Sequence, residues 1–258
     1  MTGPLFRFLS LSQYPQLIHG VFTRRGGVSQ PPFDTLNVGY STGDDSDAVT
    51  RNRNRVLSWL GMPKAMFLNQ VHGTDVLVLS RGETFPDLFW LPGDTATDIV
   101  VSADAVVTNL RHLALVIQVA DCQAVMLADI HKKVIANVHS GWRGSVGNII
   151  GRCVDVMIER FSCDPKHILA GVSPSLGPCC AQFVHYRKEI PEHLWAYKLS
   201  EEECFDFWAL SVDQLLAKGL NPDHISTMSL CTRCRTDLFF SYRKEKKTGR
   251  FACAIGLF

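Results

Sequence analysis

Three residues whose side chains can bind a metal or act in catalysis lie at the ends of apolar runs. His72 follows FLNQV, Cys122 follows VIQVAD, and His139 follows VIANV. Short apolar runs rich in β-branched residues predict buried strands, and open α/β folds place their chemistry at strand ends. The three residues are too far apart in sequence for a local metal-binding finger. We therefore expect them to converge from separate strands onto one site.

The residue types of this set fit three kinds of chemistry. Two imidazoles and one thiolate form a known catalytic zinc set, which leaves the fourth tetrahedral position for water or substrate. Zinc in such a site lowers the pKa of its bound water to about 7. Alternatively, Cys122 acts as a nucleophile with His72 or His139 as its base. Copper also accepts imidazole and thiolate ligands, so the residue types alone do not select among the three.

The stretch NVHSGWRG, residues 137–144, adds a candidate anion site beside His139. Gly141 predicts a turn after the strand, and the following pattern predicts a long amphipathic helix from about Ser145 to Phe161. Arg143 directly precedes this helix, whose N-terminal amides would also favour an anion. A surface ion pair is the alternative role for Arg143.

The remaining patterns predict an α/β fold with a mixed sheet in a single domain over residues 1–258, because no repeat or linker divides the chain. Helices are expected near Ser46–Leu60 and in DFWALSVDQLLAKGL, which Gly219 ends. The segment RGETFPDLFWLPGDTATD, residues 81–98, predicts a polar surface excursion with exposed aromatic side chains. The runs that predict strands are HGVFT, MFLNQ, VLVLS, DAVVTN, LALVIQVA, AVMLAD, KVIANV, HILAGVSPS, HISTMSL and ACAIGLF.

Charge and hydropathy exclude several classes of partner. The formal net charge is +1 and the sequence pI is about 7.6, so no whole-protein field favours nucleic acid or an anionic membrane. No apolar run approaches the ~20 residues that span a bilayer, and the N-terminus is a poor signal peptide. The basic run RNRNR, residues 51–55, has a helical setting and is interpreted as a solvated helix face. We expect a cytoplasmic protein that binds neither nucleic acid nor a membrane, with its oligomeric state open.

The cysteine pattern does not indicate a secreted disulfide framework. The chain has nine cysteines, an odd number, and Cys179 and Cys180 are adjacent. Reduced thiols in a cytoplasm fit this pattern better. Cys231 and Cys234 form a CTRC pair, but a strong zinc signature needs a second pair at a fitting distance. Because adjacent cysteines are awkward ligands for one tetrahedral site, we interpret the CTRC pair as having no metal-binding role.

Several long motifs together resemble one known family over nearly the whole chain. They are TRRGGVS, LNVGYSTGDD, NQVHGTDV, ADCQAVMLAD, NVHSGWRGSVGNII, SPSLGPCC, FFSYR and the terminal TGR. These motifs resemble the laccase-domain or YfiH-type family, also called the multicopper polyphenol oxidoreductase or purine nucleoside phosphorylase family. The resemblance implies a single α/β domain with two mixed β-sheets stacked between helices. It also implies that His72, Cys122 and His139 are the family's metal triad, which usually holds zinc and sometimes copper.

The resemblance further implies a small-molecule substrate. The family's implied activities are phosphorolysis of adenosine, inosine, guanosine and methylthioadenosine with phosphate, and hydrolytic deamination of adenosine. An older label is copper-dependent polyphenol oxidase, and some bacterial members are linked to peptidoglycan editing, which would suit a Cys–His hydrolase. The chain contains no HxH motif, and this counts against a multicopper oxidase, which needs many histidine ligands. Ser140 stands where the family usually has alanine and adds only a hydroxyl.

Four further residues are weaker candidates for the same site. Gln70 and Asp121 flank the ligands, so each is a candidate to orient an imidazole through a hydrogen bond or to carry a proton. Arg24 and Asn37 lie in a glycine-rich loop that is a candidate to close over substrate, with a purely structural turn as the alternative. The leading hypothesis is a zinc-dependent purine nucleoside enzyme.

Overall fold

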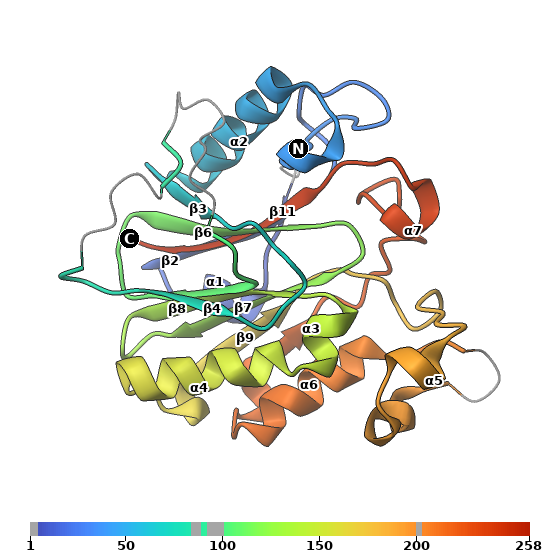
Figure 1. Ribbon diagram of the computed structural model, residues 1–258. Coiled ribbons are helices and arrows are strands. Elements are labelled where there is room, and N and C mark those ends of the chain that lie inside the picture. Colours follow the sequence, from blue (N-terminus) through green and yellow to red (C-terminus); the bar gives the residue numbers. More distant parts are fainter. Residues whose placement is uncertain (1–4, 84–88, 92–100, 200–202) are drawn as a thin grey trace.

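Two mixed β-sheets form the centre of the protein, which we describe from a computed structural model covering residues 5–83, 89–91, 101–199 and 203–258 (Figure 1). One sheet has the strand order β1-β2-β11-β6-β3, in which only β3 runs parallel to its neighbour. Its strands are β1 (Leu5–Phe6), β2 (Leu17–Phe22), β3 (Ala65–Phe67), β6 (Leu113–Val119) and β11 (Phe251–Leu257).

The second sheet has the strand order β10-β9-β7-β8-β5-β4, with parallel pairs at both edges and antiparallel pairs between them. Its strands are β4 (Val76–Leu79), β5 (Ala105–Thr108), β7 (Gln123–Asp129), β8 (Val134–Ser140), β9 (Ile168–Val172) and β10 (Ile225–Thr227). All ten runs that predicted strands overlap one, and only the two-residue β1 was not predicted among the described strands, so the mixed α/β prediction is confirmed.

Helices cover the outer faces of the two sheets. On the first sheet lies α2 (Ser46–Leu60), and on the second lie α4 (Ile149–Phe161) and α6 (Phe207–Ala217), which gives the stacked layers that the family resemblance implies (Figure 1). The short helices are α1 (Leu9–Ser12), α3 (Trp142–Val146), α5 (Tyr186–Glu189) and α7 (Tyr242–Glu245). Four 3-10 turns, η1–η4, span Tyr40–Thr42, Pro165–His167, Glu192–Tyr197 and Pro222–His224. Within the described residues, no helix is long and apolar enough to cross a bilayer.

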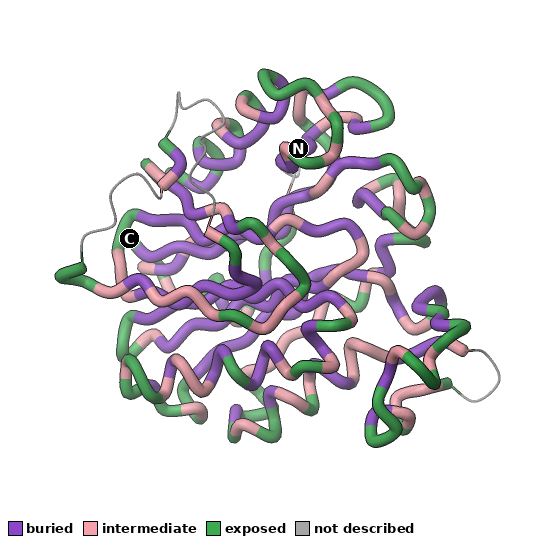
Figure 2. The backbone as a smooth tube through the Cα atoms, viewed as in Figure 1, coloured by how far each residue is buried: buried purple, intermediate pink, exposed green. Residues whose placement is uncertain are grey.

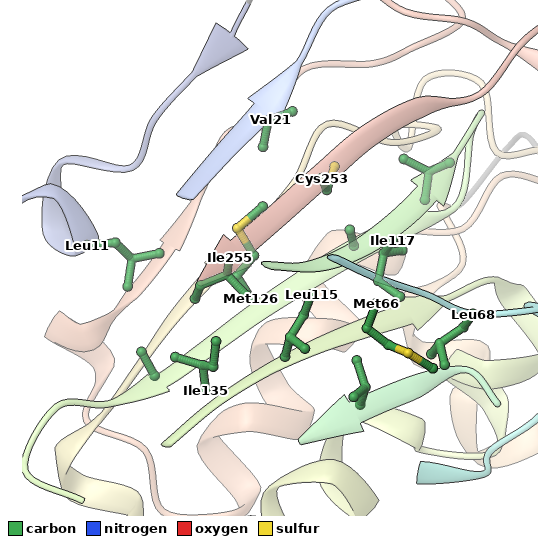
Figure 3. Packing of buried hydrophobic residues seen from close by; sticks show 14 of the residues in the cluster. Leu11, Val21, Met66, Leu68, Leu115, Ile117, Met126, Ile135, Cys253 and Ile255 are labelled. Atoms are coloured by element: carbon green, nitrogen blue, oxygen red, sulfur yellow. The ribbon is translucent and has the colours of Figure 1, made fainter. Parts of the chain in front are cut away.

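The core lies between the sheets and extends to both helical layers. Successive side chains of a strand point to opposite faces. Leu115 and Ile117 of β6 therefore face the other sheet (Figure 3), while Val116 packs under α2. Strands buried on both faces read as continuous apolar runs, which is why the sequence revealed them. Buried segments run through both sheets and exposed ones gather at the outer turns (Figure 2).

A buried asparagine links the two sheets. Asn137 of β8 donates from Nδ2 to the carbonyl oxygens of Leu115 and Cys253, each at 2.9 Å. Both acceptors belong to strands of the opposite sheet. Because a buried amide without partners costs stability, these bonds fix how β8 and its terminal His139 sit relative to the first sheet.

The prediction of one long helix from about Ser145 to Phe161 is wrong in one respect, because the structure has two helices, α3 and α4, in this region. The helical conformation is interrupted between α3 and α4 at Asn148, whose φ of 54° is left-handed. The side chain of Asn148 caps α4 by accepting a hydrogen bond from Gly151 N at 3.0 Å. Asparagine is one of the few residues that adopts this conformation readily. Arg143 therefore lies within the five-residue α3, which is too short to supply a helix-terminal anion site.

Two expectations about exposure are wrong in part. In the RNRNR run, Asn52 and Arg53 are buried, and only Arg51 and Arg55 are exposed as a solvated face would require. In the predicted surface excursion, Trp90 is buried and pairs with β3 through Ala65. Residues 81–83 and Leu91 are exposed, as predicted, and residues 84–88 and 92–98 of that prediction lie outside the described residues.

Candidate active site

His72, Cys122 and His139 converge at one edge of the stacked sheets, as predicted. Cys122 lies between β6 and β7, His139 is near the end of β8, and His72 follows β3 in a loop. Cys122 Sγ lies 3.8 Å from His72 Nε2, and the two imidazole rings meet edge to face with centroids 4.8 Å apart. The three ligand atoms lie within 4.8 Å of one another. This spacing and this donor set fit a zinc or copper ion.

The space between these ligands depends on Gly141. A Cβ atom at this position would lie 2.8 Å from His72 Cδ2 and 3.2 Å from Cys122 Sγ. The first distance is too short for carbon atoms that do not share a bond, so a larger residue would push His72 away. The turn after β8 therefore needs glycine for steric reasons, since its φ of −75° is open to any residue.

Asp104 organises two of the three ligands, and sequence reasoning missed it. Its Oδ1 lies 2.7 Å from His139 Nδ1, so the Nε2 of that ring is left to face the centre. The same carboxylate accepts from the backbone nitrogens of His72 at 2.9 Å and Gly73 at 2.7 Å. A carboxylate that fixes the orientation and tautomer of a ligating imidazole is a common feature of metal sites. The only sequence signal was an aspartate directly before the buried run AVVT.

The negative charges of Cys122 and Asp104 and the positive charge of His139 stabilise one another. Burial alone would raise the pKa of the Cys122 thiol, but the charge and hydrogen bonds of His139 and His72 bring that pKa down to about 6. Burial alone would lower the pKa of His139, but Cys122 and Asp104 raise it to about 9. Thiolate is the form of cysteine that binds metals or attacks substrates. The electrostatics therefore suit both the metal-ligand and the nucleophile interpretations.

A cavity of about 970 Å³ opens at these ligands. Among the described residues, its lining contains four arginines, Arg53, Arg143, Arg243 and Arg250, and a single acidic residue, Asp121. Such an excess of guanidinium groups attracts an anionic substrate. Aromatic side chains form much of the remaining wall, namely Tyr40, Phe67, Trp90, Trp142, Phe183, Phe207 and Tyr242.

Arg53 is a pocket residue that sequence reasoning missed. Its guanidinium carbon lies 3.8 Å from the ring centroid of Phe67, 4.3 Å from that of Tyr40 and 5.1 Å from that of Trp90. Burial lowers its pKa to about 10, against the opposing effect of Tyr40, so the group keeps its charge at neutral pH. A cation held against three rings gains from their negative faces. Its position in a basic helical run gave no sign of these partners.

Three other predicted residues line the cavity. Arg143 is exposed, lies over the Trp142 ring at 4.3 Å, and takes part in no ion pair among the described residues. The Gln70 amide is tied to the backbone of Gln118 through two 2.8 Å bonds. Asp121 accepts from Thr232 Oγ1 and Ser241 Oγ at 2.7 Å, and from Arg243 N at 2.5 Å. Gln70 and Asp121 were candidates to orient an imidazole, but the residue that orients the imidazole of His139 is Asp104.

Arg24 and Asn37 lie outside this cavity, contrary to prediction. Arg24 is buried and forms ion pairs with Glu245 at 2.7 Å and Asp34 at 3.4 Å. Asn37 is fully buried, and its amide bonds to neighbouring loop groups and to Arg250 N at 2.8 Å. Their partners hold the glycine-rich loop in place, so the structural alternative describes both residues.

The interpretation of the CTRC pair as lacking a suitable partner pair is wrong. Cys179, Cys180, Cys231 and Cys234 meet at a second cluster, with all four sulfur atoms within 4.8 Å of one another. The fold brings together two loops that are distant in sequence, and a turn at residues 178–180 directs both adjacent cysteines toward the pair.

The fold and the first cluster together define a class of protein: two stacked mixed sheets that carry a His–Cys–His centre and an arginine-lined cavity at one edge. Residues 18–258 match the family model described as multi-copper polyphenol oxidoreductase laccase. The chain belongs to this family, as the motifs indicated.

Relatives and solved structures agree with this assignment. The chain is 30% identical over 253 residues to purine nucleoside phosphorylase YlmD of Geobacillus stearothermophilus, covering 93% of this chain and 89% of the relative. It is 33% identical to purine nucleoside phosphorylase YfiH of Escherichia coli, covering 91% of each chain. The crystal structure of the Geobacillus YlmD protein matches with a TM-score of 0.86 at 27% identity, over 100% of this chain and 97% of that chain.

Proposed function

We propose that the protein is a zinc-dependent purine nucleoside phosphorylase. The observation that carries this proposal is one cavity whose described lining combines a His–Cys–His centre with four arginines and one carboxylate. The arginines suit phosphate, and the aromatic wall suits a planar base. The names of the relatives, purine nucleoside phosphorylase YlmD and YfiH, support the same class of reaction.

Phosphorolysis requires phosphate and nucleoside to be held together. An oxygen of phosphate bonds to C1′ of the ribose as the bond from C1′ to N9 of the purine breaks, and the electron pair leaves with the base. When bound by His72, Cys122 and His139, zinc supplies a positive, Lewis-acidic charge at the cavity wall. We propose that Arg143 binds the phosphate, because among the described residues it is the exposed arginine of the cavity and takes part in no ion pair.

Gln70 and Asp121 are proposed as positioning residues. The two hydrogen bonds of Gln70 hold the His72 loop against β6. Asp121 is tied by three donors and adjoins Cys122, so it fixes the turn that presents the thiolate. Three hydrogen-bond donors already occupy the oxygen atoms of this carboxyl group, which favours a positioning role.

We propose adenosine, inosine, guanosine and methylthioadenosine as substrates, with deamination of adenosine as a second reaction of the same cavity. In deamination, the oxygen of water bonds to C6 of the purine and ammonia leaves. This reaction needs no phosphate. It therefore depends on the His–Cys–His centre but not on a phosphate-binding arginine, which gives a way to separate the two roles.

The alternatives explain the cavity less well. A multicopper oxidase needs several clusters of histidine ligands, whereas the potential metal clusters among the described residues contain only two histidines, His72 and His139. A Cys–His hydrolase would use Cys122 as a nucleophile and leaves the four arginines without a role. Retention of the full wild-type zinc content by an inactive Cys122→Ser variant would favour the hydrolase.

The purified full chain should release hypoxanthine from inosine only when phosphate is present, with ribose 1-phosphate as the second product.

Arg143→Ala should raise the KM for phosphate about ten- to a hundredfold, which corresponds to a lost charge-assisted bond of ~1.5–3 kcal/mol, and should largely retain adenosine deamination. Arg152→Ala, an exposed α4 arginine outside the cavity, is the matched control. Absence of phosphate-dependent base release would overturn the proposed activity. Equal loss of both reactions in Arg143→Ala would overturn the phosphate role.

A further inference from the structure

The four-cysteine cluster has the geometry of a thiolate metal site. Cys234 Sγ lies 3.8 Å from Cys179 Sγ and 3.6 Å from Cys180 Sγ. In a tetrahedral zinc site with Zn–S bonds of about 2.3 Å, neighbouring sulfur atoms are about 3.8 Å apart. The sulfur atoms of a disulfide are only about 2.0 Å apart. The spacing therefore matches ligands around one ion and does not match a disulfide.

The surroundings of the sulfur atoms suit thiolates. Gly177 donates its backbone N–H to Cys231 Sγ at 3.3 Å, and Arg233 Nη1 donates to Cys180 Sγ at 3.3 Å. Hydrogen bonds and a nearby cation stabilise the negative charge that four thiolates bring to one ion. The donor set is entirely sulfur, which selects zinc over magnesium or calcium.

The cluster differs from the His–Cys–His centre in coordination. Four cysteine ligands fill a tetrahedral zinc site and leave no position for substrate, which is the pattern of structural zinc. No residue of the cluster lines the arginine-rich cavity. The site is therefore suited to holding segments of the chain together and not to reacting with substrate.

The loops that carry these cysteines also form part of the cavity wall. Ser175 accepts from Thr232 N at 2.9 Å and donates its own N–H to Leu230 O at 3.2 Å, so the two loops already run side by side. Ser175, Leu176 and Ala181 of the first loop line the cavity, and Thr232 of the second bonds to Asp121. A crosslink at the cysteines would fix both segments.

We propose that Cys179, Cys180, Cys231 and Cys234 bind one zinc ion, and that this ion fixes the cavity wall between the two loops without taking part in the reaction. The proposal does not depend on the nucleoside chemistry. It concerns a second site on the same chain, whose occupancy is measured directly.

The first test is metal content of the purified full chain, by inductively coupled plasma mass spectrometry. Wild type should hold about two zinc ions per chain, and Cys122→Ser should hold about one, because each cluster makes one site. Cys231→Ser/Cys234→Ser should also hold about one. Cys153→Ala, which removes a buried α4 thiol outside both clusters, is the matched control and should hold about two. A wild-type protein with only one zinc, all of it lost in Cys122→Ser, would overturn the proposal.

A second test does not require the double cysteine variant to fold. Cys122→Ser loaded with cobalt(II) should show intense sulfur-to-cobalt charge-transfer absorption, as expected for a four-thiolate site, although its His–Cys–His thiolate is gone. Alkylation of denatured, chelator-treated Cys122→Ser should find all four cluster cysteines as thiols. Absence of the cobalt absorption, or a disulfide within the cluster of freshly purified protein, would contradict the proposed site.

Discussion

The two cysteine-containing clusters of this protein are built on different kinds of scaffold. In the first, Cys122 and His139 lie at strand ends between buried sheets, and His72 is held by a carboxylate, Asp104, that is itself fully buried. In the second, all four ligands come from loops, and Cys179 and Cys234 are exposed. The first has three ligands and lines the arginine-rich cavity, whereas the second has four and does not line it.

This difference separates a centre suited to chemistry from one suited to support. Catalytic groups must be held within a fraction of an ångström, which sheets and buried hydrogen bonds achieve better than loops. An ion with four thiolate ligands instead gives rigidity to loops that have little hydrophobic core of their own. Changes at the first cluster should therefore abolish the reaction, and changes at the second should only weaken substrate binding.

The largest effect is expected for His139→Ala. Removing this imidazole leaves two protein ligands for the metal, so the variant should lose one zinc ion per chain, and phosphorolysis and deamination should both fall to background. The control is His131→Ala, an exposed histidine that belongs to neither cluster. Metal analysis and steady-state kinetics on the same samples measure both effects. Substantial turnover by zinc-depleted His139→Ala would contradict the claim that the first cluster is the reaction centre.

Asp104→Asn should have the next largest effect. The variant keeps the size of the side chain but loses the charge that fixes His139, so zinc affinity should fall about ten- to a hundredfold, as is typical of such partners. Competition with a chromophoric chelator gives the affinity of the first cluster. An unchanged zinc affinity would show that strand geometry alone positions His139.

Cys231→Ser/Cys234→Ser should have a smaller effect on catalysis. The loosened cavity wall should raise the KM for nucleoside about tenfold at most, which corresponds to ~1.4 kcal/mol, while kcat stays close to the wild-type value. Kinetics at varied nucleoside concentration separate the two constants. A loss of kcat as complete as that of His139→Ala would mean that both clusters serve the reaction.

The smallest effect concerns a histidine outside both clusters. His19 accepts a hydrogen bond from Phe8 N at Nε2, and burial together with Arg7 lowers its pKa from 6.5 to about 4. Between these values the unfolded chain binds the proton and the folded protein does not, so the stabilising effect is present above pH 6.5 and is lost as pH falls toward 4. Lowering the pH from 7 to 5.5 should cost wild type about 1 kcal/mol more than His19→Gln. Urea unfolding of both proteins at the two pH values measures this, and equal losses would contradict the assignment.

The sequence predicted those features that depend on local pattern. Strands β5 to β9 and β11 were readable because both of their faces are buried. Helix α2 has the predicted bounds because Asp45 caps its start and Gly61, with φ of 64°, ends it. The convergence of His72, Cys122 and His139 was predictable because apolar runs precede all three ligands.

The features that were missed depend on tertiary partners. Arg53 reads as a surface residue until Tyr40, Phe67 and Trp90 are placed around it. Asp104 is one of many aspartates until its bond to His139 is known. The four-cysteine cluster forms from two loops with no periodic pattern, so spacing alone could not pair them. The glycine-rich loop suggested a lid, whereas the buried bonds of Arg24 and Asn37 make it a fixed part of the fold.

Zinc content and turnover of Cys122→Ser, measured on one preparation, test the central claim that this thiolate is a metal ligand in the reaction centre. The variant should lose one zinc ion per chain relative to wild type, and phosphate-dependent release of hypoxanthine should disappear with it. If the variant instead keeps the full zinc content of wild type and is inactive, Cys122 acts as a nucleophile and the proposed metal centre is wrong.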